Sequence, residues 1–286
     1  MTNTGTRFSL LVAFLILFAA CSGSKTINSI HVDQPPVIDA SSSDWPSKAM
    51  NRELTQDFDL AFTNDDEFFY LHVRFRNNSV WRMARDFGMR IYFDGDTGLR
   101  RSFGIVYPAG IVNALADIPG ARKDYLTNPG WENMSENRRL ITRIENDQPD
   151  RVLIISRTSS DQSIRPFQIS KDQLRANSIE VSMSDDTRLR QLEIKVPIHI
   201  SRNRDFAVQP DNNGRFRLGF EIIPPEYQEV TGEPVAYESR ESASAREYGN
   251  RRPQQGQELA VSHPQLYHRL NDAYRNWFNV RIRKSE

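Results

Sequence analysis

The side chains that could catalyse a reaction lack the spacing of known catalytic motifs. The chain contains no His-Glu-x-x-His or Gly-x-Ser-x-Gly motif and no glycine-rich loop that would hold a phosphate. Its histidines are scattered, and His263 and His268 are five residues apart, which is a poor spacing for two ligands of one metal ion. A pair of carboxylates brought together by the fold is the remaining catalytic arrangement. We therefore expect a protein that is not an enzyme and that needs no cofactor.

The acidic run from Asp94 to Gly98 carries carboxylates at alternate positions, as calcium loops do. An EF-hand loop would have Gly where Leu99 stands and Glu where Ile105 stands. This mismatch favours a plain hairpin turn over a metal site. The alternative is a calcium ion held by Asp94 and Asp96 together with oxygen atoms from other loops.

The tryptophans are the best candidates for ligand contact, because aromatic rings stack on the apolar faces of sugar rings. Trp45 follows apolar residues and is expected in the core. Trp81 lies off the apolar stripe of a predicted helix, and Trp131 lies in an irregular insertion beside a Pro-Gly pair. We therefore take Trp81 and Trp131 as candidate carbohydrate-binding residues. Packing under a long loop is the alternative for both rings.

Composition and charge exclude several classes of protein. The 286 residues include 37 Lys and Arg and 37 Asp and Glu, so the net charge of zero argues against a nucleic-acid partner. No apolar run reaches the roughly 18 residues of a membrane-spanning helix. The single cysteine, Cys21, excludes disulfides, iron–sulfur clusters and all-cysteine zinc sites within one chain.

The N-terminus is typical of a secretory signal peptide. Arg7 precedes a mostly apolar run from Phe8 to Ala20. Residues 1–20 are therefore predicted to be a signal peptide that is removed from the mature chain. The residues around Cys21 indicate that it is a lipoprotein signal peptide.

The residues around Cys21 resemble the bacterial lipobox, in which the thiol receives a diacylglycerol and becomes the first residue after cleavage. Small Ala19 and Ala20 precede the cysteine, although Phe18 stands where the motif prefers Leu. We expect lipidation of Cys21, with residues 21–26 as a short tether. Ordinary cleavage near Ala20 is the alternative.

The residue after the cysteine favours one membrane of the bacterial cell envelope. An Asp at this position often retains a lipoprotein in the inner membrane, and here the residue is Ser22. The lipid-anchored chain is therefore expected in the outer membrane, and both the periplasmic and the extracellular face are compatible with Ser22.

Apolar and polar residues alternate along most of the remaining chain, which is typical of strands with one buried face. Turn residues at 64–67 and 94–98 each join two such segments and predict two hairpins. The alternating segments are 58–62, 69–75, 89–93, 103–107, 152–156, 179–183, 192–196, 216–222 and 278–282. Many short strands separated by turns indicate an all-β fold, an antiparallel β-sandwich with short helical insertions. Residues 27–286 are expected to form one domain.

Helices are expected at a few places between the strands. Apolar residues recur at helical spacing within 80–87, between a cap at Asn78 or Ser79 and a stop at Gly88. A short helix is expected within the insertion at 114–150, and another begins near Pro264.

Residues 226–258 differ from the rest of the chain in composition. They are rich in Glu, Arg, Ser, Gln and Gly and poor in aliphatic residues, which predicts a mobile excursion from the domain.

Several short motifs together resemble the family 9-type carbohydrate-binding modules and their DOMON-like relatives. Pro36 to Ala40, followed by Asp44 to Pro46, is similar to the start of these domains, with Ala40 where Gly is usual. The segment from Asn64 to Val73 is similar to their second signature. Later matches are Arg90 to Asp94, Phe103 to Pro108, Glu193 to Pro197 and Arg217 to Glu221.

The resemblance implies a β-sandwich that in some members binds sugar ends between two Trp rings, and in others binds haem or acts as an interaction module. Trp81 and Trp131 lie outside the matching motifs, so the family's sugar-binding residues are not carried over to them. The leading hypothesis is a non-enzymatic envelope lipoprotein whose β-sandwich binds carbohydrate or glycan. The alternative is an envelope protein–protein interaction or scaffold module without a sugar ligand.

Overall fold

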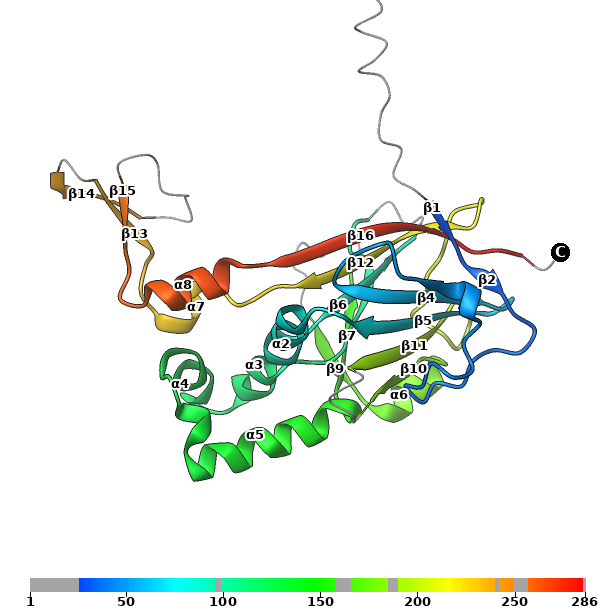
Figure 1. Ribbon diagram of the computed structural model, residues 1–286, viewed down its shortest axis with the longest axis horizontal. Helices are drawn as coiled ribbons and strands as arrows, with labels where there is room; N and C mark the ends of the chain where they lie inside the picture. The colour runs from blue at the N-terminus through cyan, green and yellow to red at the C-terminus, as the bar shows by residue number, and fades with distance from the viewer. Residues whose placement is uncertain are drawn as a thin grey trace, which may run out of the picture.

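The computed structural model describes residues 26–95, 99–157, 166–184, 190–239, 242–248 and 257–284, and these form two packed β-sheets with helices at one end (Figure 1). The seven-stranded sheet has the order β1-β16-β12-β6-β7-β8-β9. These strands are β1 (Thr26–Asn28), β16 (Tyr274–Arg281), β12 (Arg215–Ile222), β6 (Arg90–Asp94), β7 (Phe103–Val106), β8 (Val152–Ser156) and β9 (Phe167–Ile169).

The second sheet is six-stranded, with the order β10-β11-β5-β4-β2 and β3 paired to β4. Its strands are β10 (Glu180–Met183), β11 (Gln191–Pro197), β5 (Phe68–Phe75), β4 (Phe58–Asn64), β2 (Ile30–His31) and β3 (Met50–Asn51). Neighbouring strands are antiparallel except for the pairs β1–β16 and β2–β4, which are parallel. The predicted hairpins β4–β5 and β6–β7 are both confirmed.

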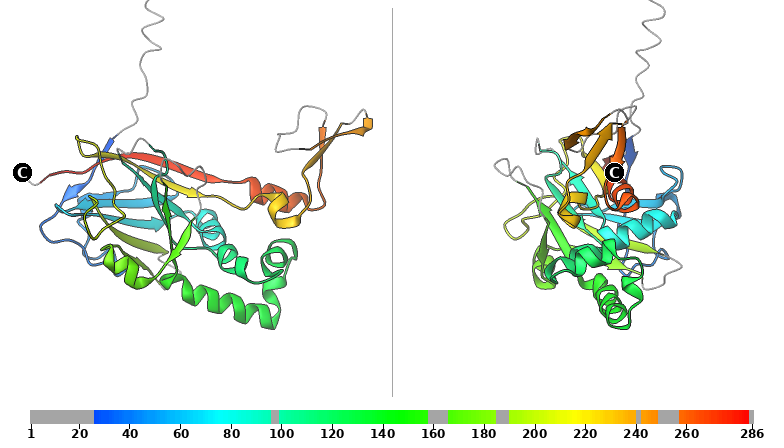
Figure 2. Two further views of the ribbon diagram at one scale, coloured as in Figure 1. Left: turned by 180° about the vertical axis from the view of Figure 1, so that it is seen from behind. Right: turned by 90° about the vertical axis from the view of Figure 1, so that its left-hand side faces the viewer.

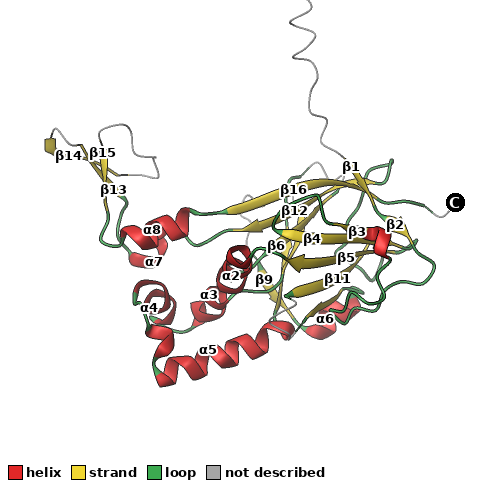
Figure 3. Ribbon diagram, in the orientation of Figure 1, coloured by secondary structure: helices red, strands yellow, loops and turns green. Residues whose placement is uncertain are grey.

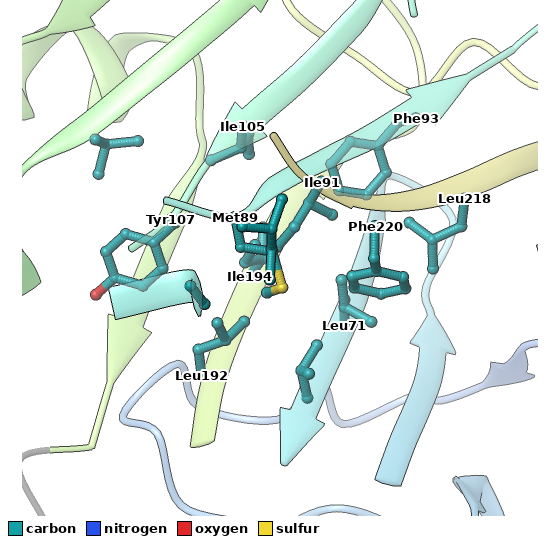
Figure 4. Packing of buried hydrophobic residues seen from close by; sticks show 14 of the residues in the cluster. Leu71, Met89, Ile91, Phe93, Ile105, Tyr107, Leu192, Ile194, Leu218 and Phe220 are labelled. Atoms are coloured by element: carbon teal, nitrogen blue, oxygen red, sulfur yellow. The ribbon is translucent and has the colours of Figure 1, made fainter. Parts of the chain in front are cut away.

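The core lies between the two sheets because each strand turns every second side chain toward the opposite sheet. Ile91 and Phe220 of one sheet and Leu71 and Ile194 of the other are completely buried. Figure 4 shows side chains from these strands gathered in one cluster. The predicted β-sandwich is therefore confirmed.

The fold is mostly β with some helices between the strands, so an all-β fold is not confirmed. Figure 3 shows several helices grouped at the end of the sandwich away from the C-terminus. These are α2 (Asn78–Phe87), α3 (Ile111–Ala114), α4 (Ala121–Thr127), α5 (Ser135–Asp147), α7 (Tyr227–Thr231) and α8 (Pro264–Asn271), with 3₁₀ turns at Leu115–Asp117, Trp131–Asn133 and Gln148–Asp150. We call α3, α4, α5, α7 and α8 the helical lobe. Within the lobe, α3, α4 and α5 share a small core of their own, whereas Tyr227 of α7 and Leu266 of α8 belong to the main core.

The predicted helix after β5 exists, but its cap is one residue earlier than expected. The side chain of Asn77, rather than Asn78 or Ser79, accepts a hydrogen bond from the backbone N–H of Ser79. Gly88 ends the helix with a φ of +83°, and a Cβ there would lie 2.6 Å from the carbonyl oxygen of Ala109. Only glycine fits this turn.

Several small elements were not predicted, among them β1, β2 and β3. Strand β9 closes the seven-stranded sheet, and α6 (Lys171–Ala176) follows it. Ser170 and Gln173 form a reciprocal capping box at the start of α6, and their spacing is a sequence signal for a helix. A further 3₁₀ turn lies at Ser47–Ala49. None of the helices among the described residues is long and apolar enough to cross a membrane.

The segment 226–258 contains regular structure where none was expected. After α7 it forms β13 (Ala236–Ser239) and β14 (Ser242–Tyr248), and β15 (Gln257–Ala260) completes a three-stranded sheet with the order β14-β13-β15. Figure 1 shows this sheet outside the sandwich, beyond α7 and α8. The segment does leave the main domain, but it does so as a paired antiparallel sheet, whose backbone hydrogen bonds its polar composition did not reveal.

A buried carboxylate fixes the first described loop on the outer face of the six-stranded sheet. Glu193 is completely buried, and its Oε2 accepts the backbone N–H groups of Asp39 at 2.9 Å and Ala40 at 2.8 Å. Its Oε1 accepts the indole N–H of Trp45 at 2.6 Å. Trp45 is buried, as predicted, but it belongs to a small cluster with Ala49, Ala61 and Tyr70 on this outer face and not to the core between the sheets. Ala40 has a φ of +62°, which explains why Gly is usual at this position of the resembling domains.

His72 lies directly opposite Glu193 on the neighbouring strand and shares its burial. Burial raises the pKa of Glu193 from 4.5 to about 7. Burial lowers the pKa of His72 from 6.5 to about 4. Both groups therefore favour their neutral forms in the folded protein, and their contributions to stability change with pH in opposite directions.

These opposite shifts predict opposite effects of two substitutions. In Glu193→Gln, His72 is the one group of this pair that still titrates, so its contribution to the free energy of unfolding should fall as the pH drops from 6.5 toward 4. In His72→Gln, Glu193 is the group that still titrates, so its contribution should fall as the pH rises from 4.5 toward 7. Each slope is at most about 1.4 kcal/mol per pH unit. Urea unfolding at a series of pH values measures them. The unchanged chain is the control. If the slope of the unfolding free energy against pH changed in the same direction in both variants, the opposite pKa shifts of Glu193 and His72 would be contradicted.

Candidate functional site

A pocket with a volume of about 680 Å³ lies between the end of α2, the end of α4 and the start of α8. This volume is in the usual range for a small-molecule site. The side chains that give it its chemistry are Arg85, Asp86, Tyr125, Trp131, His263 and Arg269. We call it the lobe pocket.

Asp86 connects the three helices around the lobe pocket. It is buried on the last turn of α2, and its Oδ1 accepts hydrogen bonds from Arg85 Nη2 at 3.0 Å and from the Tyr125 hydroxyl at 3.0 Å. Its Oδ2 accepts from Arg269 Nη2, on α8, at 2.8 Å. Two guanidinium groups thus compensate the buried negative charge. Burial, and next the charge of Asp86, raise the pKa of Tyr125, which keeps the hydroxyl a donor at neutral pH.

Trp131 and Tyr125 supply the aromatic part of the lobe pocket. The edge of one ring faces the other, with centroids 6.1 Å apart and planes at 84°. Gly130, with a φ of +84°, makes the turn that places Trp131 at the start of its 3₁₀ turn. Trp131 also packs on Ile111 and Ile141 in the core of the lobe. It is only 9% exposed, so the ring is packed within the insertion, as the alternative for this residue had it, and it also lines a pocket.

Trp81 lies elsewhere. It is half-buried on α2, where its ring meets Phe75 edge-on at 5.0 Å and packs against the main core. Trp81 is not part of the lobe pocket's lining. The structure therefore does not bring Trp81 and Trp131 together as two facing platforms. A direct ligand contact by either ring stays a prediction.

Asp94 ends β6 as a buried side chain and not as an open metal ligand. Its Oδ1 accepts the backbone N–H of Ser102 at 3.1 Å, and burial raises its pKa. Asp96 and Cys21 lie outside the described residues. Within the described part of the chain, no three His, Cys, Asp or Glu side chains gather in a way that could hold a metal ion. A calcium ion at Asp94 and Asp96 stays a prediction.

A second aromatic feature crosses the outer face of the seven-stranded sheet. Trp277, Gly219, Tyr92 and Gly104 stand side by side on β16, β12, β6 and β7. The two rings are nearly parallel, at 12°, with centroids 5.7 Å apart. A Cβ on Gly219 would lie 2.6 Å from the Trp277 ring, and one on Gly104 would lie 2.9 Å from Tyr92. Each ring therefore occupies the space that the absent side chain of a neighbouring glycine leaves free.

Charged groups surround this row. Glu221 is completely buried and accepts Trp277 Nε1 at 3.1 Å and Arg101 Nη2 at 2.6 Å. The guanidinium of Arg217 lies 4.8 Å from the centre of the Trp277 ring, within range of a cation–π interaction. Trp277 thus contacts Tyr92, Glu221 and Arg217.

Sequence reasoning missed most of these residues. Asp86 and Arg269 are 183 positions apart, and no local pattern links them. The aromatic row did have a signal, because Gly104 and Gly219 each interrupt an alternating strand, and a glycine inside a strand often marks a close approach by another group.

Comparison with known proteins found similar structures but no related sequences. No family model and no curated protein matches the chain. A family 9 carbohydrate-binding module from Caldicellulosiruptor kristjanssonii in complex with cellotriose is similar, with a TM-score of 0.33 and 12% identity over 92% of this chain and 95% of that chain. A module of the same family and organism in complex with glucose gives a TM-score of 0.35 and 10% identity over 92% of this chain and 97% of that chain. Both belong to the family that the sequence motifs resemble.

The row predicts a coupling between Gly219 and Trp277. Gly219→Ala should lower the free energy of unfolding by about 1–3 kcal/mol, because the new methyl group overlaps the indole ring. In a Trp277→Ala chain the same change should cost less than about 1 kcal/mol, since the overlapping ring is gone. Urea unfolding of the four chains of this double-mutant cycle measures the coupling. Equal costs in both backgrounds would show that the ring does not occupy this space.

Proposed function

We propose that this protein is a non-enzymatic binding module that takes a carbohydrate or glycan in the lobe pocket. One observation carries the proposal: Trp131 and Tyr125 stand beside a buried, hydrogen-bonded ionic cluster in one pocket of about 680 Å³. Sugars present apolar C–H faces together with hydroxyl groups. A site for them combines aromatic surface with fixed donors and acceptors.

The ionic cluster supplies those donors in fixed positions. Arg85 and Arg269 each keep further N–H groups beyond the ones that Asp86 accepts, because a guanidinium has five. Asn128 and His263 add polar groups to the same lining. Since the cluster is held from three helices, it is in place before a ligand arrives, and this lowers the entropic cost of binding.

The proposal for the anchor comes from the N-terminal sequence. Removal of residues 1–20 would leave Cys21 at the start of the mature chain, with a lipid on its thiol and residues 21–26 as the tether. Because Ser22 is not Asp, the proposed location is the outer membrane of a bacterial envelope. The lipid would hold the module at the membrane surface, where glycans are abundant.

Sugar binding is tested by titrating a chain that begins at Lys25 with mono- and oligosaccharides, with and without calcium, by calorimetry and tryptophan fluorescence. We expect saturable binding that becomes roughly ten-fold weaker or more in Trp131→Ala, because the stacking surface is lost. Trp81→Ala is the matched control and should bind as the unchanged chain does, since Trp81 lies outside the lobe pocket.

Because Trp131 also packs in the lobe, Trp131→Phe serves as a milder variant, and a thermal melt checks that each chain is folded. A folded Trp131→Phe chain with unchanged affinity would remove Trp131 from the site. A flat response of the unchanged chain to every sugar would favour the alternative, a protein–protein interaction or scaffold module.

Lipidation is tested by expressing the full chain in bacteria with radiolabelled palmitate. The unchanged chain should incorporate the label and appear in the membrane fraction, and Cys21→Ser should lose both properties, since no other thiol is present. An unlabelled chain of the unchanged sequence, cleaved near Ala20, would instead establish ordinary signal-peptide processing.

A further inference from the structure

Five basic side chains gather where the first strand of the structure meets the last one. Lys48, Arg283 and Lys284 line one pocket beside β1, and Arg281 joins Arg283 and Lys284 in the adjoining pocket. Arg215 stands directly opposite Arg281 on the neighbouring strand. All five side chains are exposed. We call this group the basic end.

We propose that the basic end docks on the phosphate groups of anionic lipids at the membrane surface. The proposal rests on the lipid anchor proposed above. It adds a second, electrostatic attachment that orients the protein. The argument has three steps: the charge of this surface, its distance from Cys21, and the direction in which the lobe pocket then faces.

Among the described residues, positive charge exceeds negative charge at the basic end. Arg215 and Arg281 are cross-strand neighbours on one face of the sheet, where like charges repel. Asp33 lines the pocket of Lys48, and Asp94 and Asp211 line the pocket of Arg215. Asp211 accepts the backbone N–H of Arg215 at 2.7 Å, and Asp94 accepts that of Ser102. Within the described residues, none of the five basic side chains makes an ion pair closer than 4 Å. An anion between Arg215 and Arg281 would relieve their repulsion.

Phosphate is the anion that this surface fits. A guanidinium binds a phosphate through two parallel N–H groups, so two arginines on adjacent strands can hold one headgroup from two sides. The backbone beneath them is well fixed, because Ser29 donates its N–H to the Arg281 carbonyl at 2.9 Å and Asn64 donates its Nδ2 to the Arg283 carbonyl at 2.8 Å. The cations therefore sit on a rigid surface.

The distance to Cys21 places the basic end close to the bilayer. Strand β1 starts at Thr26, and its last residue, Asn28, pairs with Arg281. The five residues from Cys21 to Thr26 span at most about 18 Å when fully extended. Lysine and arginine side chains are attracted to an anionic membrane surface within roughly a Debye length, which is about 8–10 Å. A lipid on Cys21 would thus keep Thr26 within about 18 Å of the bilayer, a reach that allows the protein to turn until the basic end lies within a Debye length of the surface.

Docking at this end would direct the lobe pocket away from the membrane. Figures 1 and 2 show that β1 and the C-terminus lie toward one end of the long axis, whereas α4 and α8 lie toward the other end, where the β13–β15 sheet extends beyond them. The lobe pocket is built from α2, α4 and α8. A protein held by its basic end would therefore present this pocket to the surrounding space.

The test measures binding of the unlipidated chain to vesicles. Residues 21–286 with Cys21→Ser are mixed with vesicles of phosphatidylcholine alone or with vesicles that also contain about 30% phosphatidylglycerol. This content lets one basic surface contact several anionic lipids at once. We expect co-sedimentation with the anionic vesicles only, and weaker binding as salt is added. Arg215→Gln with Arg281→Gln should lower the affinity roughly thirty-fold, from the contribution of each basic residue near a membrane surface.

The matched control removes the same charge from the helical lobe. Arg139 and Arg143 are exposed on α5, and Arg139→Gln with Arg143→Gln should leave vesicle binding unchanged. Equal loss in both double variants would overturn the proposal, because it would show a response to net charge only. Binding of the unchanged chain to phosphatidylcholine alone at equal affinity would overturn it too.

Free phosphate is a third arm. Inorganic phosphate at millimolar concentration should compete only weakly with vesicles, since one ion replaces a single headgroup. Saturable phosphate binding without any vesicle binding would assign the basic end to a soluble anion, and capture of an acidic protein without vesicle binding would assign it to a partner. Either result would overturn membrane docking.

The outcome is separable from that of the proposed function. Arg215→Gln with Arg281→Gln lies far from the lobe pocket and should leave sugar affinity unchanged. Loss of vesicle binding with intact sugar binding supports the proposal made here. Vesicle binding by a chain that binds no sugar would reject the carbohydrate ligand and keep the membrane surface.

Discussion

The alternation of side chains along each strand is the constraint on which the core and both outer faces of the sandwich depend. Because one set of side chains must fill the core between the sheets, the other set is placed on an outer face. On the six-stranded sheet that face carries His72 and Glu193, which the loop around Trp45 covers; burial lowers the pKa of His72 and raises the pKa of Glu193. On the seven-stranded sheet it carries Glu221 under the Trp277 ring and a series of arginines that stay exposed.

The position of α7 and α8 in the helical lobe depends on the length of two strands of the seven-stranded sheet, β12 and β16. Strands β12 and β16 stay paired up to Ile222 and Tyr274, beyond the part of β16 that β1 covers. The two strands thus deliver α7 and α8 to the same place, next to α2. Only then can Arg269 reach Asp86 and complete the wall of the lobe pocket. The proposed ligand site therefore depends on the pairing of β12 with β16, the last strand of the chain.

The two ends of the molecule then have different chemistry. One end combines the start of β1 with the basic residues at the end of β16, close in sequence to Cys21. The other combines aromatic rings with an ionic cluster in a pocket. The net charge of zero does not reveal this difference, because it counts charges over the whole chain without regard to their position. The separation suits a module that is fixed at one end and binds at the other.

The sequence by itself determined most strands of the two sheets, the two hairpins, the burial of Trp45 and the β-sandwich, because each follows from alternation and turn residues within a few positions. It did not reveal the extent of the helical lobe or the sheet within 226–258, where polar composition masked the pairing. Only the tertiary structure decided that Trp131 lines a pocket with Asp86 and Arg269, and that Arg215 stands beside Arg281. The physical reason is that contacts between distant segments depend on strand register and helix packing, which local spacing does not encode.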